Sequence, residues 1–212
     1  MTYVSVRAYL RERLLSVLFL GCGTLVFGCT SLLTAMLLGT HGLNFSGTVF
    51  AMGAFLSAAF HLACASSTHQ GGTPRPHSGY HAPLLTAVAL LCVVAVVAGA
   101  LSGALPAFFE IGSGSTALAQ VVLGASAVMF AGSSALIFNV FSSSRSPVLF
   151  RYSMALGATA AGILGVILSS GDVQAATMRL GWAALYLGGL LLLTSVLSAE
   201  RQSATPRRPR SP

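Results

Sequence analysis

Long apolar runs separated by short polar segments dominate the pattern of this chain. Residues 14–74 contain no Asp, Glu, Lys or Arg, and further charge-free gaps lie at 152–171 and 180–199. Because a helix needs about 20 apolar residues to cross the hydrocarbon core of a membrane, the pattern predicts six spans. Their expected bounds are about 14–38, 47–66, 84–105, 116–140, 152–171 and 180–199.

The polar segments between the runs indicate how the spans connect. The turn between the first two spans is expected at Gly39, Gly42, Asn44 and Gly47. Backbone amides in lipid find no water, so each span must be helical. The expected fold class is therefore all-α, a polytopic membrane helix bundle with six transmembrane helices. One transmembrane domain covers residues 1–200, and a basic, disordered cytoplasmic tail covers 201–212.

The arginines orient this bundle. Ten of the eleven lie before the first span, between spans two and three, between spans four and five, or after span six. Cationic flanks stay on the cytoplasmic side during insertion. Aromatic residues such as Phe45, Phe108 and Tyr152 fall near the ends of the expected spans, where amphipathic rings prefer to sit. We therefore expect a protein integral to the cell membrane with both termini cytoplasmic.

Composition agrees with a membrane location. Of 212 residues, 55% are hydrophobic and 7% are charged, whereas a soluble domain carries about 25% charged residues. The net charge of +7 is divided among loops and tail rather than gathered on one face, which argues against nucleic acid as a partner. The expected partner of these cations is a lipid bilayer with an anionic inner leaflet.

The first apolar run permits a second interpretation, a signal peptide that is cleaved. Val26-Phe27-Gly28-Cys29 loosely resembles a lipoprotein cleavage site. However, the run is longer than the signal core of about 7–15 residues, and further spans follow it. We therefore expect a retained span.

Polar residues inside a span are costly and therefore mark candidate sites. His61 is the ionisable candidate within the expected spans, and Gln120 and Asn139 are the larger neutral ones. We interpret these three as candidates for a substrate pathway. The alternative is that His61 only bonds a neighbouring helix or reaches the inner headgroups. The spans hold no buried carboxylate, which disfavours a proton- or sodium-coupled carrier.

Other reactive residues form no recognisable site. The four cysteines lie inside spans without the C-x-x-C spacing of redox or zinc motifs, so we expect them to be packing residues. His77 and His81 have an i, i+4 spacing, but nearby prolines oppose a helix there and no further ligand lies in the loop. The segment 132–135 (GSSA) could supply a serine nucleophile, but such catalysis needs a histidine base, and nothing in the sequence places His61 beside this segment. The sequence predicts no enzyme activity, metal or cofactor.

Small residues at helical spacing predict where the spans meet. Lipid gives apolar helices no hydrophobic reason to associate, so small residues let the backbones approach and dispersion act. Such residues recur at every fourth position in the third and fifth spans. The residues expected in helix packing are Gly99, Gly103, Gly157, Ala161 and Gly165.

The two halves of the chain echo one another. Residues 20–33 read LGCGTLVFGCTSLL and residues 123–136 read LGASAVMFAGSSAL. One residue further in offset, the segment 51–54 (AMGA) resembles 155–158 (ALGA), while the third and sixth spans show no echo. Because three is odd, a three-plus-three repeat would invert the halves in the membrane, an arrangement typical of transporters. The alternative is chance similarity among Gly- and Ala-rich helices.

Six spans, short connections and the echo favour a small-solute permease, a pore or the membrane subunit of a transport complex. The alternative is a non-transporting membrane scaffold or an accessory protein for assembly, which the small-residue rows and the lack of charged pathway residues favour. A transport subunit would bind a membrane or ATPase partner subunit through loops 67–83 and 142–151. Assembly into a homo-oligomer is a further alternative. A permease predicts a polar midplane cavity lined by groups such as His61, Gln120 or Asn139.

Reporter fusions test the expected topology. Fusions at residues 44, 112 and 174 should report the outside of the membrane, and fusions at 75, 147 and 212 the inside. The reason is that arginine-rich connections alternate with connections poor in cations. Paired reporters, each active on one side only, measure the side at each position. A reversal at any position would contradict the order of six spans.

Overall fold

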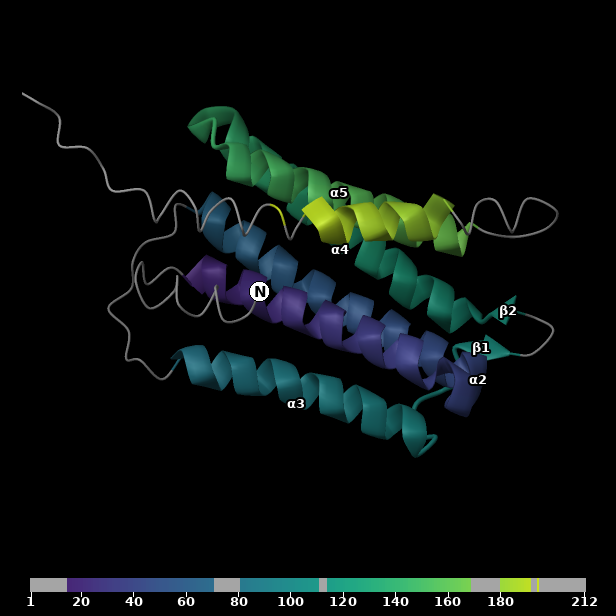
Figure 1. Ribbon diagram of the computed structural model, residues 1–212. Coiled ribbons are helices and arrows are strands. Elements are labelled where there is room, and N and C mark those ends of the chain that lie inside the picture. The colour runs from purple at the N-terminus through teal and green to yellow at the C-terminus, as the bar shows by residue number, and fades with distance from the viewer. Residues whose placement is uncertain (1–14, 71–80, 111–113, 169–179, 192–193, 195–212) are drawn as a thin grey trace, which may run out of the picture.

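Five helices account for most of the regular structure in the residues that the computed structural model describes, which are 15–70, 81–110, 114–168, 180–191 and 194. The helices lie side by side as a bundle of alternating direction (Figure 1). Their bounds are α2 Leu15–His69, α3 His81–Leu101, α4 Ala117–Ser144, α5 Pro147–Ile167 and an unlabelled C-terminal helix, Leu180–Leu191. Two short antiparallel strands, β1 Phe109–Glu110 and β2 Gly114–Ser115, join α3 to α4.

α2 is a hairpin rather than one long rod. Gly42 interrupts it with φ 80° and ψ −178°, a conformation that glycine adopts without the steric penalty of a Cβ atom. Residues 15–41 form a first arm and residues 43–69 a second arm, which lie antiparallel (Figure 1). The two arms correspond to the first two expected spans. The turn is shorter than expected, because Gly42 alone is non-helical and the other three turn candidates are helical.

Small residues and hydroxyl groups hold the two arms together. Gly53 faces Thr30 so closely that a Cβ atom at position 53 would collide with the threonine side chain. The Ser57 hydroxyl donates a hydrogen bond to the Gly23 carbonyl oxygen on the other arm, at 2.9 Å. Because apolar helices gain little from association in lipid, such close contacts are what keep the hairpin shut.

α3 packs against α2 through one side only. Ala89 and Val93 pack on the first arm, and Val96 packs on the second arm. The opposite side of α3 is apolar and exposed, and it includes Leu84, Val88, Leu91 and Val94. An apolar surface of this kind is what a lipid-facing helix presents.

α3 ends at Leu101, before the expected bound at residue 105. Gly103 adopts φ 69°, a left-handed conformation that stops the helix. The amides of Ala104 and Leu105 both donate to the Gly99 carbonyl oxygen, at 3.0 and 3.2 Å. Turn chemistry, which apolar content does not report, therefore sets this boundary.

α4 and α5 form a second hairpin that polar contacts close. Its turn consists of Arg145, with φ 55°, and Ser146. The Ser134 hydroxyl donates to the Ser153 carbonyl oxygen at 2.8 Å, and the Ser153 hydroxyl donates to the Ser134 carbonyl oxygen at 3.0 Å. This reciprocal pair joins the two helices about two to three turns from their connection.

The bounds of the fourth and fifth expected spans shift. α4 continues to Ser144 rather than 140, and α5 begins at Pro147 rather than 152. The fixed φ of proline suits the first turn of a helix, which explains the early start. The described C-terminal helix, Leu180–Leu191, lies within the sixth expected span, but as described it is not among the helices long enough to cross a membrane. Apart from residue 194, the rest of that span and the expected tail, 201–212, lie outside the described residues.

The C-terminal helix packs on α5 at glycines. A Cβ atom added to Gly181 would lie 2.9 Å from the Gly162 carbonyl oxygen. A Cβ atom added to Gly188 would lie 2.5 Å from the Thr159 hydroxyl. Real Cβ atoms do not approach so closely, so both glycines are needed for this backbone contact.

The connection between α3 and α4 is anchored on the second arm of α2. The Asn44 amide oxygen accepts the backbone N–H groups of Phe108 and Phe109, each at 3.0 Å. The Phe109 ring occupies the space beside Gly47, and Phe108 is buried in the main core. Asn44 thus holds the segment before α4 beside the Gly42 turn, which sets where along the bundle α4 begins.

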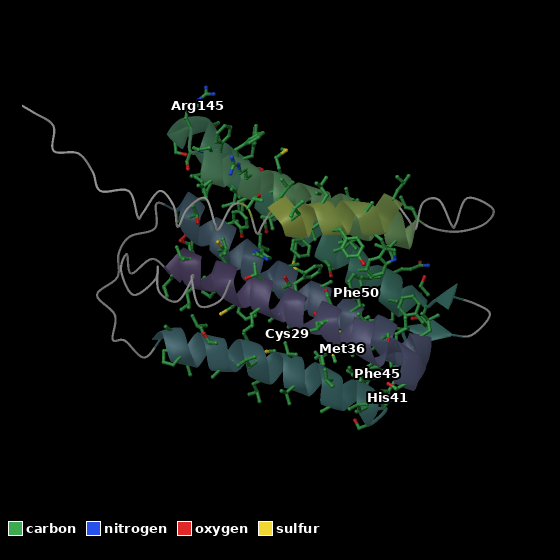
Figure 2. The ribbon with its side chains drawn as sticks, in the orientation of Figure 1. Cys29, Met36, His41, Phe45, Phe50 and Arg145 are labelled. Carbon is green, nitrogen blue, oxygen red and sulfur yellow. The ribbon has the colours of Figure 1, made fainter. Side chains whose placement is uncertain are left out.

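Four of the described helices, α2, α3, α4 and α5, are long and apolar enough to cross a membrane. Their outer faces expose large apolar side chains, including Leu32, Met36, Val121 and Val128. These helices mark the chain as a membrane-embedded protein. Figure 2 shows Arg145 and His41 at opposite ends of the bundle.

Replacing Gly53 with alanine tests the contact between the arms. Gly53→Ala should lower the free energy of unfolding by about 1–3 kcal/mol, because the added methyl group overlaps Thr30. Thermal unfolding of the purified protein in detergent measures the change. Gly28→Ala is the matched control on an open helix surface, where nothing lies within 4 Å of the added atom. Equal effects of the two substitutions would contradict the packing.

Candidate functional site

A histidine–tyrosine pair lies buried where α2 meets α5. His61 on the second arm is 1% exposed, and Tyr152 on α5 is 3% exposed. A hydrogen bond joins the His61 Nδ1 atom and the Tyr152 hydroxyl, 2.8 Å apart. The pair links residues that are distant in the sequence, so it ties α2 to the α4–α5 hairpin.

Close neighbours confine the His61 ring. A Cβ atom on Gly23 would lie 2.9 Å from His61 Nε2, so only glycine on the first arm leaves room for the imidazole. The Phe130 ring of α4 lies 5.7 Å away, measured between ring centroids. Cys64 belongs to the same buried core cluster as Phe130 and Tyr152. Four helical segments therefore meet at this imidazole.

The chemistry of the site is that of neutral hydrogen bonding. The tyrosine hydroxyl can donate and accept, and either tautomer of a neutral imidazole offers one donor and one acceptor. Within the described part of the chain, no group of three or more His, Cys, Asp or Glu side chains is arranged to hold a metal ion. The pair can exchange a hydrogen bond with a small polar molecule if the contact between the helices opens.

The other two pathway candidates lie far from His61 and from each other. Gln120 is exposed near the start of α4, with its Nε2 3.4 Å from the Ser115 hydroxyl. Asn139 is exposed near the end of α4, with its Nδ2 3.2 Å from His69 Nε2. A helix rises about 1.5 Å per residue, so roughly 28 Å of α4 separates them. The three candidates do not line one cavity.

The residues expected in helix packing have mixed surroundings. Gly157 faces Ser134 of α4, 3.3 Å from where a Cβ atom would stand, and Gly165 lies against Gly181 of the C-terminal helix. Ala161 is exposed. Gly99 meets only Leu105 of the following turn, and Gly103 lies in that turn rather than in a helix. Gly99 and Gly103 do not pack on another helix because α3 ends at Leu101.

A hollow of about 260 Å³ lies at the end of the bundle that contains Gly42. His41, Asn44 and Thr48 supply its polar wall, and Figure 2 shows His41 and Phe45 together at this end. Their rings lie 5.0 Å apart. Phe45, the end of α3 (Ala100 and Leu101) and the turn that follows it (Gly103 and Leu105) complete the lining. None of the three pathway candidates contributes to it, so this hollow is separate from the His61 site.

Sequence reasoning missed Tyr152 as a partner of His61. The expected fifth span began at residue 152, which placed the tyrosine at the membrane surface. Because α5 begins at Pro147, Tyr152 lies more than one turn inside the helix, at the level of His61. Asn44 was expected only in a turn, and no pattern in the sequence indicated that it binds residues 108 and 109.

Comparison of the chain with protein-family models, with curated proteins and with solved structures finds no match. The described residues therefore offer one candidate site on geometry, the buried His61–Tyr152 pair.

Removing one hydroxyl tests this pair. Tyr152→Phe should destabilise the protein by about 0.5–2 kcal/mol, because the buried imidazole loses its partner in a place that water does not reach. Thermal unfolding in detergent measures the loss. Tyr186→Phe is the control, since Tyr186 is 75% exposed. An unchanged melting temperature for Tyr152→Phe would show that the pair contributes nothing to folding.

Proposed function

We propose that the chain is a six-span integral membrane protein of the cell membrane that acts as a small-solute permease, a pore or the membrane subunit of a transport complex. The observation that carries this proposal is the buried His61–Tyr152 hydrogen bond between α2 and α5. Polar groups inside the membrane are costly and persist where they serve a pathway. The proposed site is therefore this contact.

The arrangement of the helix ends supports the proposed topology. The start of α2, its end at His69 and the α4–α5 turn lie at one end of the bundle, and the turn at Gly42 lies at the other (Figure 1). Arg145 belongs to the first end (Figure 2). In the six-span proposal this is the cytoplasmic end, where cations are retained.

The described arrangement corresponds to a closed state in this proposal. His61 is packed against Gly23, Phe130 and Tyr152, so passage of a solute requires α5 and the second arm to separate. No described span carries a charged residue at its middle, which favours a neutral polar solute. Such a solute would replace the tyrosine as the hydrogen-bond partner of His61.

A non-transporting scaffold or assembly protein is the second candidate. The full burial of His61 and the separation of Gln120 from Asn139 favour it. In that case the His61–Tyr152 pair is only a polar link between helices, of the kind that membrane bundles use for cohesion. The two candidates differ in whether water and solute ever reach the pair.

Cys64 provides a native probe of this difference. In a variant in which Cys22, Cys29 and Cys92 are alanine, Cys64 remains as the sole thiol, in the same buried core cluster as Tyr152. A permease should let a small, membrane-impermeant methanethiosulfonate reagent modify Cys64 in intact proteoliposomes, because the pathway opens past His61. Mass spectrometry measures the modified fraction. Modification should also reduce the flux of small neutral solutes in a swelling assay.

Cys22 provides the matched control. It is buried as deeply as Cys64 but lies between the first arm and α3, away from the pair. A variant with Cys22 as its sole thiol should stay unmodified under the same conditions. If neither thiol reacts before denaturation, the scaffold is favoured. If both react equally, general loosening of the bundle rather than a pathway explains the labelling.

A further inference from the structure

The turns of the two helical hairpins stand at equivalent positions. In the echo between residues 20–33 and 123–136, each residue corresponds to the one 103 positions later. Carried forward, this offset pairs Gly42 with Arg145. Both residues have positive φ, at 80° and 55°, and both lie at the turn of a hairpin. Outside these two turns, the only other positive φ in the described residues is at Gly103.

The lengths of the turns explain why the echo changes its offset. Gly42 is the single non-helical residue in the first turn, whereas Arg145 and Ser146 are both non-helical in the second. One additional residue increases the offset from 103 to 104 after the turn. The similarity of 51–54 with 155–158 has that increased offset. A chance similarity between apolar helices would not be expected to change its offset at the turn.

The contact that closes each hairpin also recurs. In the first hairpin, Gly53 faces the Thr30 hydroxyl, and in the second, Gly157 faces the Ser134 hydroxyl. The offset of 104 that holds after the turn relates Gly53 to Gly157, whereas the offset of 103 before the turn relates Thr30 to Ser133, the neighbour of Ser134. Each hairpin therefore brings an equivalent glycine of its second helix against a hydroxyl of its first helix, and the two hydroxyls differ by one residue from exact equivalence.

The two hairpins meet through equivalent residues. Phe27 and Phe130 occupy the same position in the echo, and their rings lie 6.4 Å apart in an edge-to-face arrangement. The first arm and α4 run antiparallel (Figure 1). When a residue touches its own equivalent, the contact lies on a two-fold axis and the interface is self-complementary. A two-fold axis that exchanges the two helices would pass between Phe27 and Phe130, near the middle of each helix and perpendicular to both.

We infer that α2 and the α4–α5 hairpin are inverted repeats that dock through one self-complementary face centred on Phe27 and Phe130. The partner that fits the inner face of the first arm is thus a second hairpin of the same kind, turned over in the membrane. α3 reverses the direction of the chain between the two, which is why the repeats are inverted. This inference concerns architecture and does not rest on the proposed transport.

Reciprocal disulfides test the two-fold relation in the full-length chain. The four native cysteines are replaced by alanine, and cysteines are introduced in pairs that the axis exchanges. One pair is Thr30→Cys with Ala127→Cys, and its reciprocal is Thr24→Cys with Ser133→Cys. Thr30, Ala127 and Ser133 are buried and Thr24 is half-buried, and all four lie three residues to either side of the central phenylalanines. Oxidation in membranes followed by mass spectrometry of the linked peptides measures the yield of each disulfide.

A two-fold axis predicts that both pairs form disulfides in the same yield. The control pair, Gly28→Cys with Ala131→Cys, is also related by the offset but lies on exposed surfaces, so it should not form one. The melting temperature of each reduced variant checks that the bundle is intact. A disulfide in one pair without its reciprocal would overturn the inference, because it requires a crossing that is off the axis. Failure of both pairs in folded variants would also overturn it.

Discussion

The bundle depends on how closely its helix backbones can approach. Apolar helices in lipid are not driven together by burial from water, so dispersion and short polar contacts must do so. Three times in the described residues a glycine stands opposite a hydroxyl of a neighbouring helix. These pairs are Gly53 with Thr30, Gly157 with Ser134, and Gly188 with Thr159. The missing side chain admits the neighbour, and the hydroxyl fills the space while bonding to its own or the facing backbone.

The apolar runs predicted the helices well because a membrane sets their length. Each of the four helices long enough to span coincides with an expected span or, for α2, with two of them. The ends were predicted less well, because single residues decide them. Gly103 stops α3 early, and Pro147 starts α5 early. Neither effect appears in a count of apolar residues, although both residue types are known markers of helix ends.

The site was accessible to sequence reasoning only in part. His61 stands out because an ionisable side chain inside an apolar run is unusual. Its partner Tyr152 is recognised only when the depth of each helix is known, and that depth depends on the start of α5. Gln120 and Asn139 share one helix with Phe130, yet they lie at its two ends. There, hydrogen bonds to Ser115 and His69 satisfy their side-chain amides. Periodicity along a chain indicates which face of a helix a residue occupies. A shared pathway also requires the residues to lie at the same depth in the bundle, which periodicity does not give.

The left-handed conformation of Arg145 has a consequence for how orientation is encoded. A residue with a Cβ atom is strained there by about 1–2 kcal/mol, and glycine would remove that strain. The equivalent turn in the first hairpin does use glycine, at position 42. In the proposed topology the two turns face opposite sides of the bilayer, so a cation is favoured at only one. In that topology Arg145 would place a positive charge at the cytoplasmic side at the cost of backbone strain, whereas Gly42 adopts its positive φ without that strain.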